Sequence, residues 1–181
     1  MGILAAFTVP SLFNTPSSTA NSKYTAVARD TAFMVLSAYE QYRAANSTIP
    51  TTMSIADLTP YMNYVKIDTA STIDGMQTQT SESCATYRCL VLHNGGIMRY
   101  SEMCTMGTPN EKAACWFDLD PDGKYSGTTN GPGKMMQFWL YYDGKIRTWA
   151  TMEPNTRFIW YGVTNNMNPD SSYVPPWFSG F

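Results

Sequence analysis

The sequence predicts an α+β fold in which an N-terminal spine helix packs on an antiparallel β-sheet. One long segment, residues 24–45, has apolar residues spaced to form one face of a helix. From residue 87 onward, short apolar runs alternate with turn residues, as in consecutive β-hairpins. A helix followed by such hairpins is typical of α+β proteins. A length of 181 residues fits a single domain.

The composition limits the classes of function. Charged residues make up only 14 % of the chain, against about 25 % in typical soluble domains. This low charge is common in exported and assembled proteins. The net charge is −2, whereas binding to phosphates needs clustered lysine and arginine. We therefore expect no nucleic-acid binding.

The helix predicted over residues 24–45 is amphipathic. Its apolar residues recur at steps of three and four, and most charged residues lie off this stripe. The stripe consists of Tyr24, Val27, Thr31, Met34, Val35, Ala38, Tyr39 and Tyr42. Asn46 and Pro50 are typical of a helix end. Beyond them, Ser54 and Asp57 form a capping-box pattern that predicts a second, short helix.

The remainder of the chain is predicted to be mainly β-structure. Residues 66–83 are polar and lack periodicity, so we interpret them as an irregular loop. Asn94–Gly95 and Asp143–Gly144 are hairpin turn signals. The expected strands are 87–92, 97–100, 114–119, 134–142, 145–150 and 157–163. Because strands that are neighbours in sequence usually pair, the predicted sheet is an antiparallel meander.

Four cysteines, Cys84, Cys89, Cys104 and Cys115, lie in the middle part of the chain. An even number in a low-charge chain predicts two disulfides and an oxidising compartment. Zinc is disfavoured because the spacings lack the usual C-x-x-C pairs. Four cysteines allow three pairings, of which proximity along the chain favours Cys84–Cys89 with Cys104–Cys115.

The first 13 residues are apolar and uncharged. This run is too short to span a bilayer, which needs about 20 residues. It also lacks the basic region that begins a secretory signal. Taken alone, the segment predicts a buried helix start or a frayed terminus.

Residues 2–10 resemble the second half of the hydrophobic helix of type IV pilins and type II secretion pseudopilins. The residues that carry the resemblance are Gly2, Ile3, Leu4, Ala5, Ala6, Phe7, Val9 and Pro10. The family's basic leader and first half of the helix do not precede them, so residues 1–22 are interpreted as the remnant of a truncated hydrophobic helix. Residues 23–181 are expected to form a pilin-like globular domain. Pro16 departs from the family because it interrupts a continuous helix.

This resemblance implies a structural function without catalysis or a required cofactor. The chain would be a subunit of a type IV pilus or pseudopilus filament and would assemble with other pilin subunits through its N-terminal helix. A full-length helix would anchor it in the inner membrane before assembly, and the filament would be extracellular or at the cell surface. The alternative is a secreted calcium- or carbohydrate-binding β-rich domain.

Asp118, Asp120 and Asp122, followed by Gly123, match the pattern that opens a calcium-binding loop. Alternate carboxylates can converge on one hard cation, so calcium is the one metal we expect here. The twelfth position is Thr129 rather than the glutamate of an EF-hand, which excludes that motif. The competing interpretation is an acidic turn in which aspartates accept hydrogen bonds from the backbone.

No catalytic site is predicted. The single histidine, His93, precedes a turn and is expected at a solvated tip. The sequence contains neither a nucleophile elbow nor a phosphate-binding loop motif. The five tryptophans are interpreted mainly as core residues, with an aromatic platform for a sugar as the alternative.

Overall fold

The computed structural model describes residues 16–76, 79–102, 104–106, 112–128, 133–160 and 163–181. Its first element is helix α1, Pro16–Ala45. Proline is favoured in the first turn of a helix because its missing N–H has no intrahelical partner there. The predicted helix is therefore confirmed and extends to Pro16, so the expected boundary between residues 22 and 23 falls inside α1.

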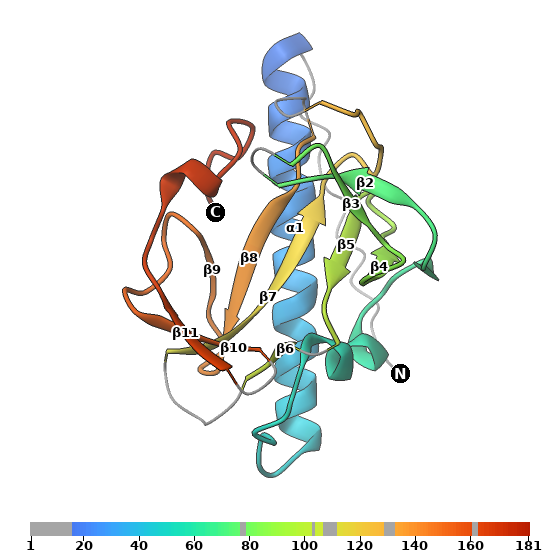
Figure 1. Cartoon of the computed structure of the whole chain (residues 1–181). Helices are drawn as coiled ribbons and strands as arrows, with labels where there is room; N and C mark the ends of the chain where they lie inside the picture. The colour runs from blue at the N-terminus through green and yellow to red at the C-terminus, as the bar shows by residue number, and fades with distance from the viewer. Residues whose placement is uncertain (1–15, 77–78, 103, 107–111, 129–132, 161–162) are drawn as a thin grey trace, which may run out of the picture.

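One face of α1 packs against the sheet. Val35, Ala38 and Tyr39 are fully buried in the same apolar cluster as residues of the central strands. On the other face, the side chain of Phe33 is 67 % exposed. Figure 1 shows α1 running behind the sheet, with both ends of the helix extending past the strands.

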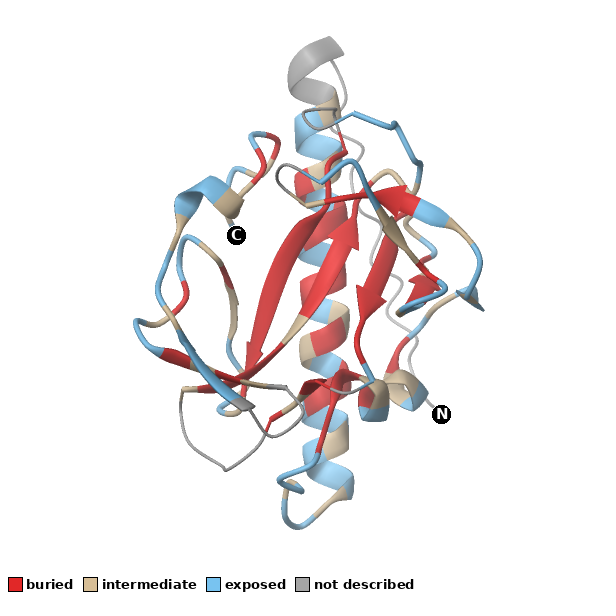
Figure 2. Cartoon of the chain, viewed as in Figure 1, coloured by how far each residue is buried: buried red, intermediate tan, exposed pale blue. Residues whose placement is uncertain are grey.

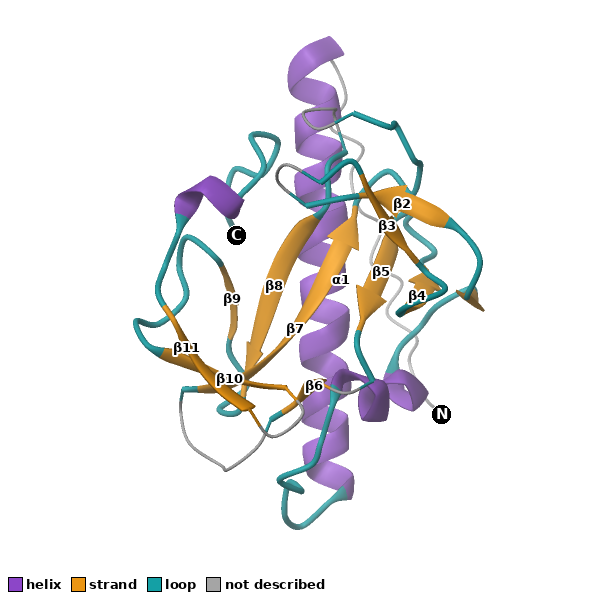
Figure 3. Cartoon of the chain, viewed as in Figure 1, coloured by secondary structure: helices purple, strands orange, loops and turns teal. Residues whose placement is uncertain are grey.

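The regular elements described after α1 are mainly strands (Figure 3). The largest sheet has nine strands: β1 (Lys66–Asp68), β4 (Arg88–Val91), β5 (Ile97–Tyr100), β6 (Cys104–Thr105), β7 (Ala113–Asp120), β8 (Met136–Tyr141), β9 (Ile146–Thr148), β10 (Thr156–Trp160) and β11 (Val163–Met167). Its order is β1-β4-β5-β7-β10-β11, while β8 pairs with β7 and β9, and β6 pairs with β10. A separate hairpin joins β2 (Thr72–Asp74) and β3 (Ser81–Ser83), and two short 3-10 helices are η1 (Ile55–Tyr61) and η2 (Ser171–Tyr173).

The expected fold class, α+β with a pilin-like helix on a simple antiparallel sheet, is wrong. The structure is a β-rich fold in which one helix precedes a large, mostly antiparallel sheet. Part of the difference lies in residues 66–83, which were expected to be a loop but contain β1, β2 and β3. These strands are short and largely polar, so they give no alternating pattern in the sequence.

The expected meander is also wrong, because β10 runs parallel to β7. Strand β5 pairs only with residues 117–120 of β7, which leaves the beginning of β7 open along that edge. There Arg157 and Phe158 pair with Ala113 and Ala114. The segment 157–163 is consequently not one strand, since Trp160 pairs with Val163 across the β10–β11 hairpin.

Local turn signals were reliable. The predicted hairpins appear as β4–β5 and β8–β9. Their turns contain Gly95 and Gly144 with φ of 90° and 85°, a conformation that glycine adopts without steric penalty. The short second helix is also present as η1, where the backbone N–H of Ser54 donates to Asp57 Oδ2 at 2.7 Å.

Both disulfides are present with the pairing that proximity favoured. Cys84–Cys89 ties the end of the β2–β3 hairpin to β4, and Cys104–Cys115 ties β6 to β7. All four side chains are buried. Two intact disulfides indicate an oxidising compartment.

The C-terminal segment, residues 175–181, lies against its own domain. Trp177 is buried, and its indole N–H donates to the Lys134 carbonyl oxygen at 2.9 Å. Thr25 of α1 donates its hydroxyl to the Trp177 carbonyl oxygen at 2.9 Å, and Arg29 donates to the Gly180 carbonyl oxygen at 2.8 Å. These bonds connect α1 to the C-terminal segment.

Loop length predicts how much each disulfide stabilises the fold. The Cys104–Cys115 bond closes a separation of 11 residues and the Cys84–Cys89 bond one of 5. Replacing both members of the first pair with alanine should lower the free energy of unfolding by about 3 kcal/mol, and replacing the second pair by about 2 kcal/mol. Urea unfolding without reductant measures both losses. Unchanged stability in either double variant would contradict this prediction.

Candidate cation site

Three carboxylates from two distant segments converge above the β2–β3 hairpin. Asp74 ends β2, Asp120 ends β7, and Asp122 lies in the turn after β7. One oxygen of each lies within 4.8 Å of the others. Asp74 and Asp120 are only 1 % and 0 % exposed, whereas Asp122 is half-buried. The site therefore combines close carboxylates with strong exclusion of water.

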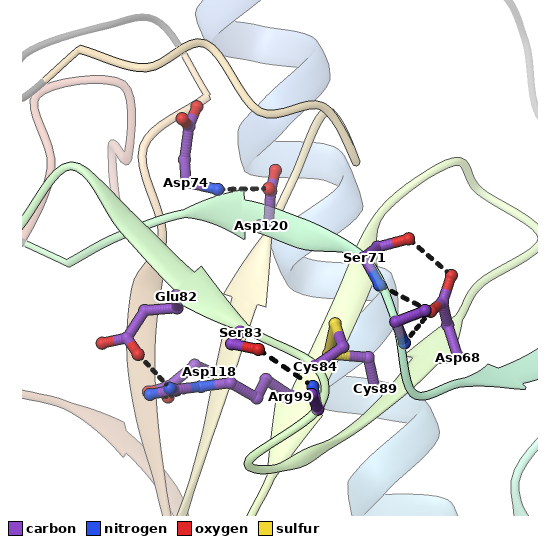
Figure 4. The surroundings of a disulfide bond; sticks show 12 residues. Asp68, Ser71, Asp74, Glu82, Ser83, Cys84, Cys89, Arg99, Asp118 and Asp120 are labelled. Carbon is purple, nitrogen blue, oxygen red and sulfur yellow. Dashed lines mark hydrogen bonds and ion pairs between the residues drawn. A yellow bond between two sulfur atoms is a disulfide. The ribbon is translucent and has the colours of Figure 1, made fainter.

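The turn after β7 and the hairpin both fix the side chain of Asp120. Its Oδ1 accepts hydrogen bonds from the backbone N–H groups of Asp122 at 3.3 Å and Gly123 at 3.0 Å. This is the local bonding by which aspartate favours turns. Its Oδ2 accepts from the Asp74 backbone N–H at 3.1 Å (Figure 4). Asp120 thus joins β7 to a hairpin more than 40 residues earlier in the sequence.

Asp74 has one satisfied and one unsatisfied carboxylate oxygen. Its Oδ1 accepts from both the backbone N–H and the hydroxyl of Ser126, each at 2.8 Å. Its Oδ2 is buried and has no hydrogen-bond partner among the described residues. A buried polar atom without a partner is unfavourable by about 1–3 kcal/mol, and more when it is charged. The site consequently lacks a positive or donor group at this oxygen.

Asp122 is held between a loop and α1. Its Oδ1 accepts from the Lys124 backbone N–H at 2.9 Å. Gly133 packs against its other side, where a Cβ would lie 2.4 Å from Asp122 Oδ2. Burial raises the pKa of Tyr24 in α1, and the nearby carboxylate of Asp122 acts in the same direction, so the helix lies close to the site. Gly133 has a φ of 84°, which disfavours a side chain, and a Cβ there would require the Asp122 carboxylate to move.

The electrostatics of the site disfavour negative charge. Burial raises the pKa of Asp120 to about 8, and the nearby carboxylate of Asp122 acts in the same direction. Hydrogen bonds from the backbone N–H groups of Asp74 and Gly123 only partly oppose this shift. Burial and the neighbouring carboxylate therefore both disfavour the ionised form of Asp120.

Asp118, which the sequence pattern placed with Asp120 and Asp122, belongs to a different group of side chains. Arg99 donates to Asp118 Oδ2 through Nε at 2.9 Å and also through Nη2. Gln137 donates to Asp118 Oδ1 at 2.9 Å, so both oxygens have partners. Arg99 Nη1 reaches Glu82 of β3 at 2.6 Å. Figure 4 shows Asp118 directed toward Arg99, apart from Asp74 and Asp120.

Sequence reasoning missed Asp74. It lies 46 residues before Asp120, in a segment interpreted as a loop, so no spacing rule connects the two. The proximity results from the β2–β3 hairpin folding over β7, which only the tertiary structure reveals. Thr129 and the resemblance-carrying residues Gly2 to Pro10 lie outside the described residues.

The remaining sequence predictions have clear positions in the fold. His93 is exposed beside its turn, as expected for a solvated tip. Trp139 and Trp177 are buried core residues, whereas Trp116 and Trp149 are half-buried. Tyr173 stacks on Trp149 with ring centres 4.6 Å apart.

Comparisons of the chain with protein-family models, with curated proteins and with solved structures gave no match.

The buried Arg99–Asp118 pair generates a stability prediction. Arg99→Met would leave the completely buried Asp118 without its cation, which should lower the free energy of unfolding by about 3–5 kcal/mol. The matched control is Arg88→Met, whose partner Glu102 and own side chain are about half exposed. That change should cost no more than about 1 kcal/mol. Urea unfolding compares the two variants, and equal losses would be the contrary result.

Proposed function

We propose that this chain is a structural subunit of a filament of the type IV pilus or type II secretion pseudopilus class. The observation that carries the proposal is the order of segments along the chain, in which the apolar run of residues 2–13 comes shortly before the start of α1 at Pro16. Among the residues whose burial is described, α1 contributes no fully buried residue before Thr25. Figure 2 shows the first pale blue part of this helix beyond the strands of the sheet. An apolar segment next in sequence to such a helix would be suited to packing with the same segment of other subunits.

The exposed face of α1 supports the same proposal. Phe33 lies there between Ala26 and Ser37, all three exposed. An exposed phenylalanine gains free energy when a neighbouring molecule covers it. A repeated contact of this kind that does not close into a ring generates a fibre. The partners would be other pilin subunits of the same or a related sequence.

An extracellular location agrees with the two disulfides, which form and persist in oxidising compartments. No helix within the described ranges is both long and apolar enough to cross a membrane. Anchoring in the inner membrane before assembly is part of the proposal only for a form that carries the complete hydrophobic helix.

The proposal predicts that assembly depends on the exposed face of α1. In the producing cells, Phe33→Glu should abolish recovery of the chain in the filament fraction sheared from the cell surface. The matched control is Val65→Glu, which alters a residue 55 % exposed beside β1. This control should assemble normally. Both sites are at the surface, so neither change should alter unfolding stability by more than about 0.5 kcal/mol.

Immunoblotting of sheared, sedimented material and electron microscopy provide the measurement. A wild-type chain found only as a soluble monomer in the medium would contradict the filament proposal and favour the secreted binding domain. Normal assembly of Phe33→Glu would contradict the role of this helix face.

A further inference from the structure

We propose that Asp74, Asp120 and Asp122 form a calcium site that fastens the β2–β3 hairpin to the end of β7 and to α1. This inference is independent of the proposed filament function, because it rests only on the interior of one subunit. The ligands come from the hairpin and from the turn after β7, and Tyr24 connects the site to the helix.

One buried carboxylate oxygen of Asp74 lacks a hydrogen-bond partner among the described residues. The side chain is 1 % exposed, and Oδ1 already has two donors, yet Oδ2 has none among the described residues. Buried polar atoms in native proteins almost always have a partner. Figure 4 shows the carboxylates of Asp74 and Asp120 directed to the same side of the hairpin. A cation placed between them would supply the missing partner.

The charge near the three carboxylates also favours a cation. Lys134 is close enough for Asp74 to affect its pKa, but its ammonium group donates to the Gln79 carbonyl oxygen at 3.0 Å. Asp118, only two residues before Asp120, is instead neutralised by Arg99. The guanidinium of Arg99 therefore neutralises Asp118, whereas Asp120 lies beside the acids Asp74 and Asp122. A divalent cation would balance that charge.

The type and spacing of the ligand atoms indicate which metal would bind. All three ligands are carboxylate oxygens, which hard cations prefer over the nitrogen and sulfur ligands typical of zinc. Two ligands on opposite sides of calcium are about 4.6–5.2 Å apart, given bond lengths of 2.3–2.6 Å. Oxygens within 4.8 Å of one another fit that sphere. Water can complete the shell on the side of half-buried Asp122.

Magnesium fits less well. It needs a near-ideal octahedron with bonds of about 2.0–2.1 Å and loses its waters reluctantly. Asp120 and Asp74 cannot easily adjust, because both are fixed by backbone hydrogen bonds. Selectivity for calcium over magnesium is thus part of the proposal.

The test measures binding and stability on the intact, oxidised chain. Calcium at a hundred times its dissociation constant should raise the melting temperature by about 5–10 °C, because it binds only the folded state. Magnesium at the same concentration should do much less. Terbium is a direct probe, since Tyr24 lies close to Asp122 and can sensitise terbium luminescence. Calcium should displace the terbium.

Three variants locate the site. Asp74→Asn and Asp120→Asn each remove one charge with little change of shape, and each should weaken calcium binding by about tenfold or more. The matched control is Asp143→Asn, at the far end of the β7–β8 ladder, where Asp143 pairs with Lys145. This control should retain the calcium response in full.

Several outcomes would overturn the proposal. They are an unchanged melting curve between chelator and millimolar calcium, terbium binding that Asp74→Asn leaves intact, and an equal response to magnesium. If a buried variant fails to fold, Asp122→Asn provides the same comparison at the half-buried ligand. Loss of filaments with intact calcium binding would contradict only the filament proposal, and the reverse result would contradict only this one.

Discussion

Two carboxylates of the central strand, Asp118 and Asp120, point to the same face of β7, and both are completely buried. On the opposite face, Phe117 and Leu119 belong to the apolar core that includes α1. Ionised carboxylates are not stable in such an interior without partners. The polar face of β7 therefore needs another segment to pack on it and to supply hydrogen-bond donors or cations. The β2–β3 hairpin packs there, and the Asp74 backbone N–H donates to Asp120.

The two buried carboxylates meet this requirement in different ways. Both oxygens of Asp118 have partners within the protein, Arg99 and Gln137, and Arg99 also pairs with Glu82. The guanidinium also lies over the Tyr87 ring, 4.4 Å from its centre, which favours the charged form. Asp120 is surrounded by backbone donors and by two further acids. The contrast explains why a metal is inferred at one position and not two residues earlier.

What the sequence predicted correctly was local. The periodicity of α1, the turns at Gly95 and Gly144, and the pairing of nearby cysteines all depend on residues close together in the chain. The wrong predictions depended on distant contacts. The parallel pairing of β10 with β7 has no sequence signature, and the strands of residues 66–83 are too short and polar to show periodicity, although Ile73 is fully buried. For the candidate site, the pattern after β7 was informative for Asp120 and Asp122, whereas Asp118 pairs with Arg99 and Asp74 was missed.

The candidate cation site and the C-terminal segment hold the same part of α1. Tyr24 lies near the Asp122 carboxylate, and its ring meets that of Trp177 edge-on with ring centres 6.0 Å apart. One residue later, Thr25 bonds to the Trp177 carbonyl oxygen, and Arg29 bonds to that of Gly180. These contacts fix the helix at the point where it leaves the domain. In a filament joined through N-terminal helices, any load on α1 would reach the sheet first at this point. A cation there would bind the helix, the hairpin and the central strand together, so calcium would stiffen the connection between the assembled core and the outer domain without touching the interface between subunits.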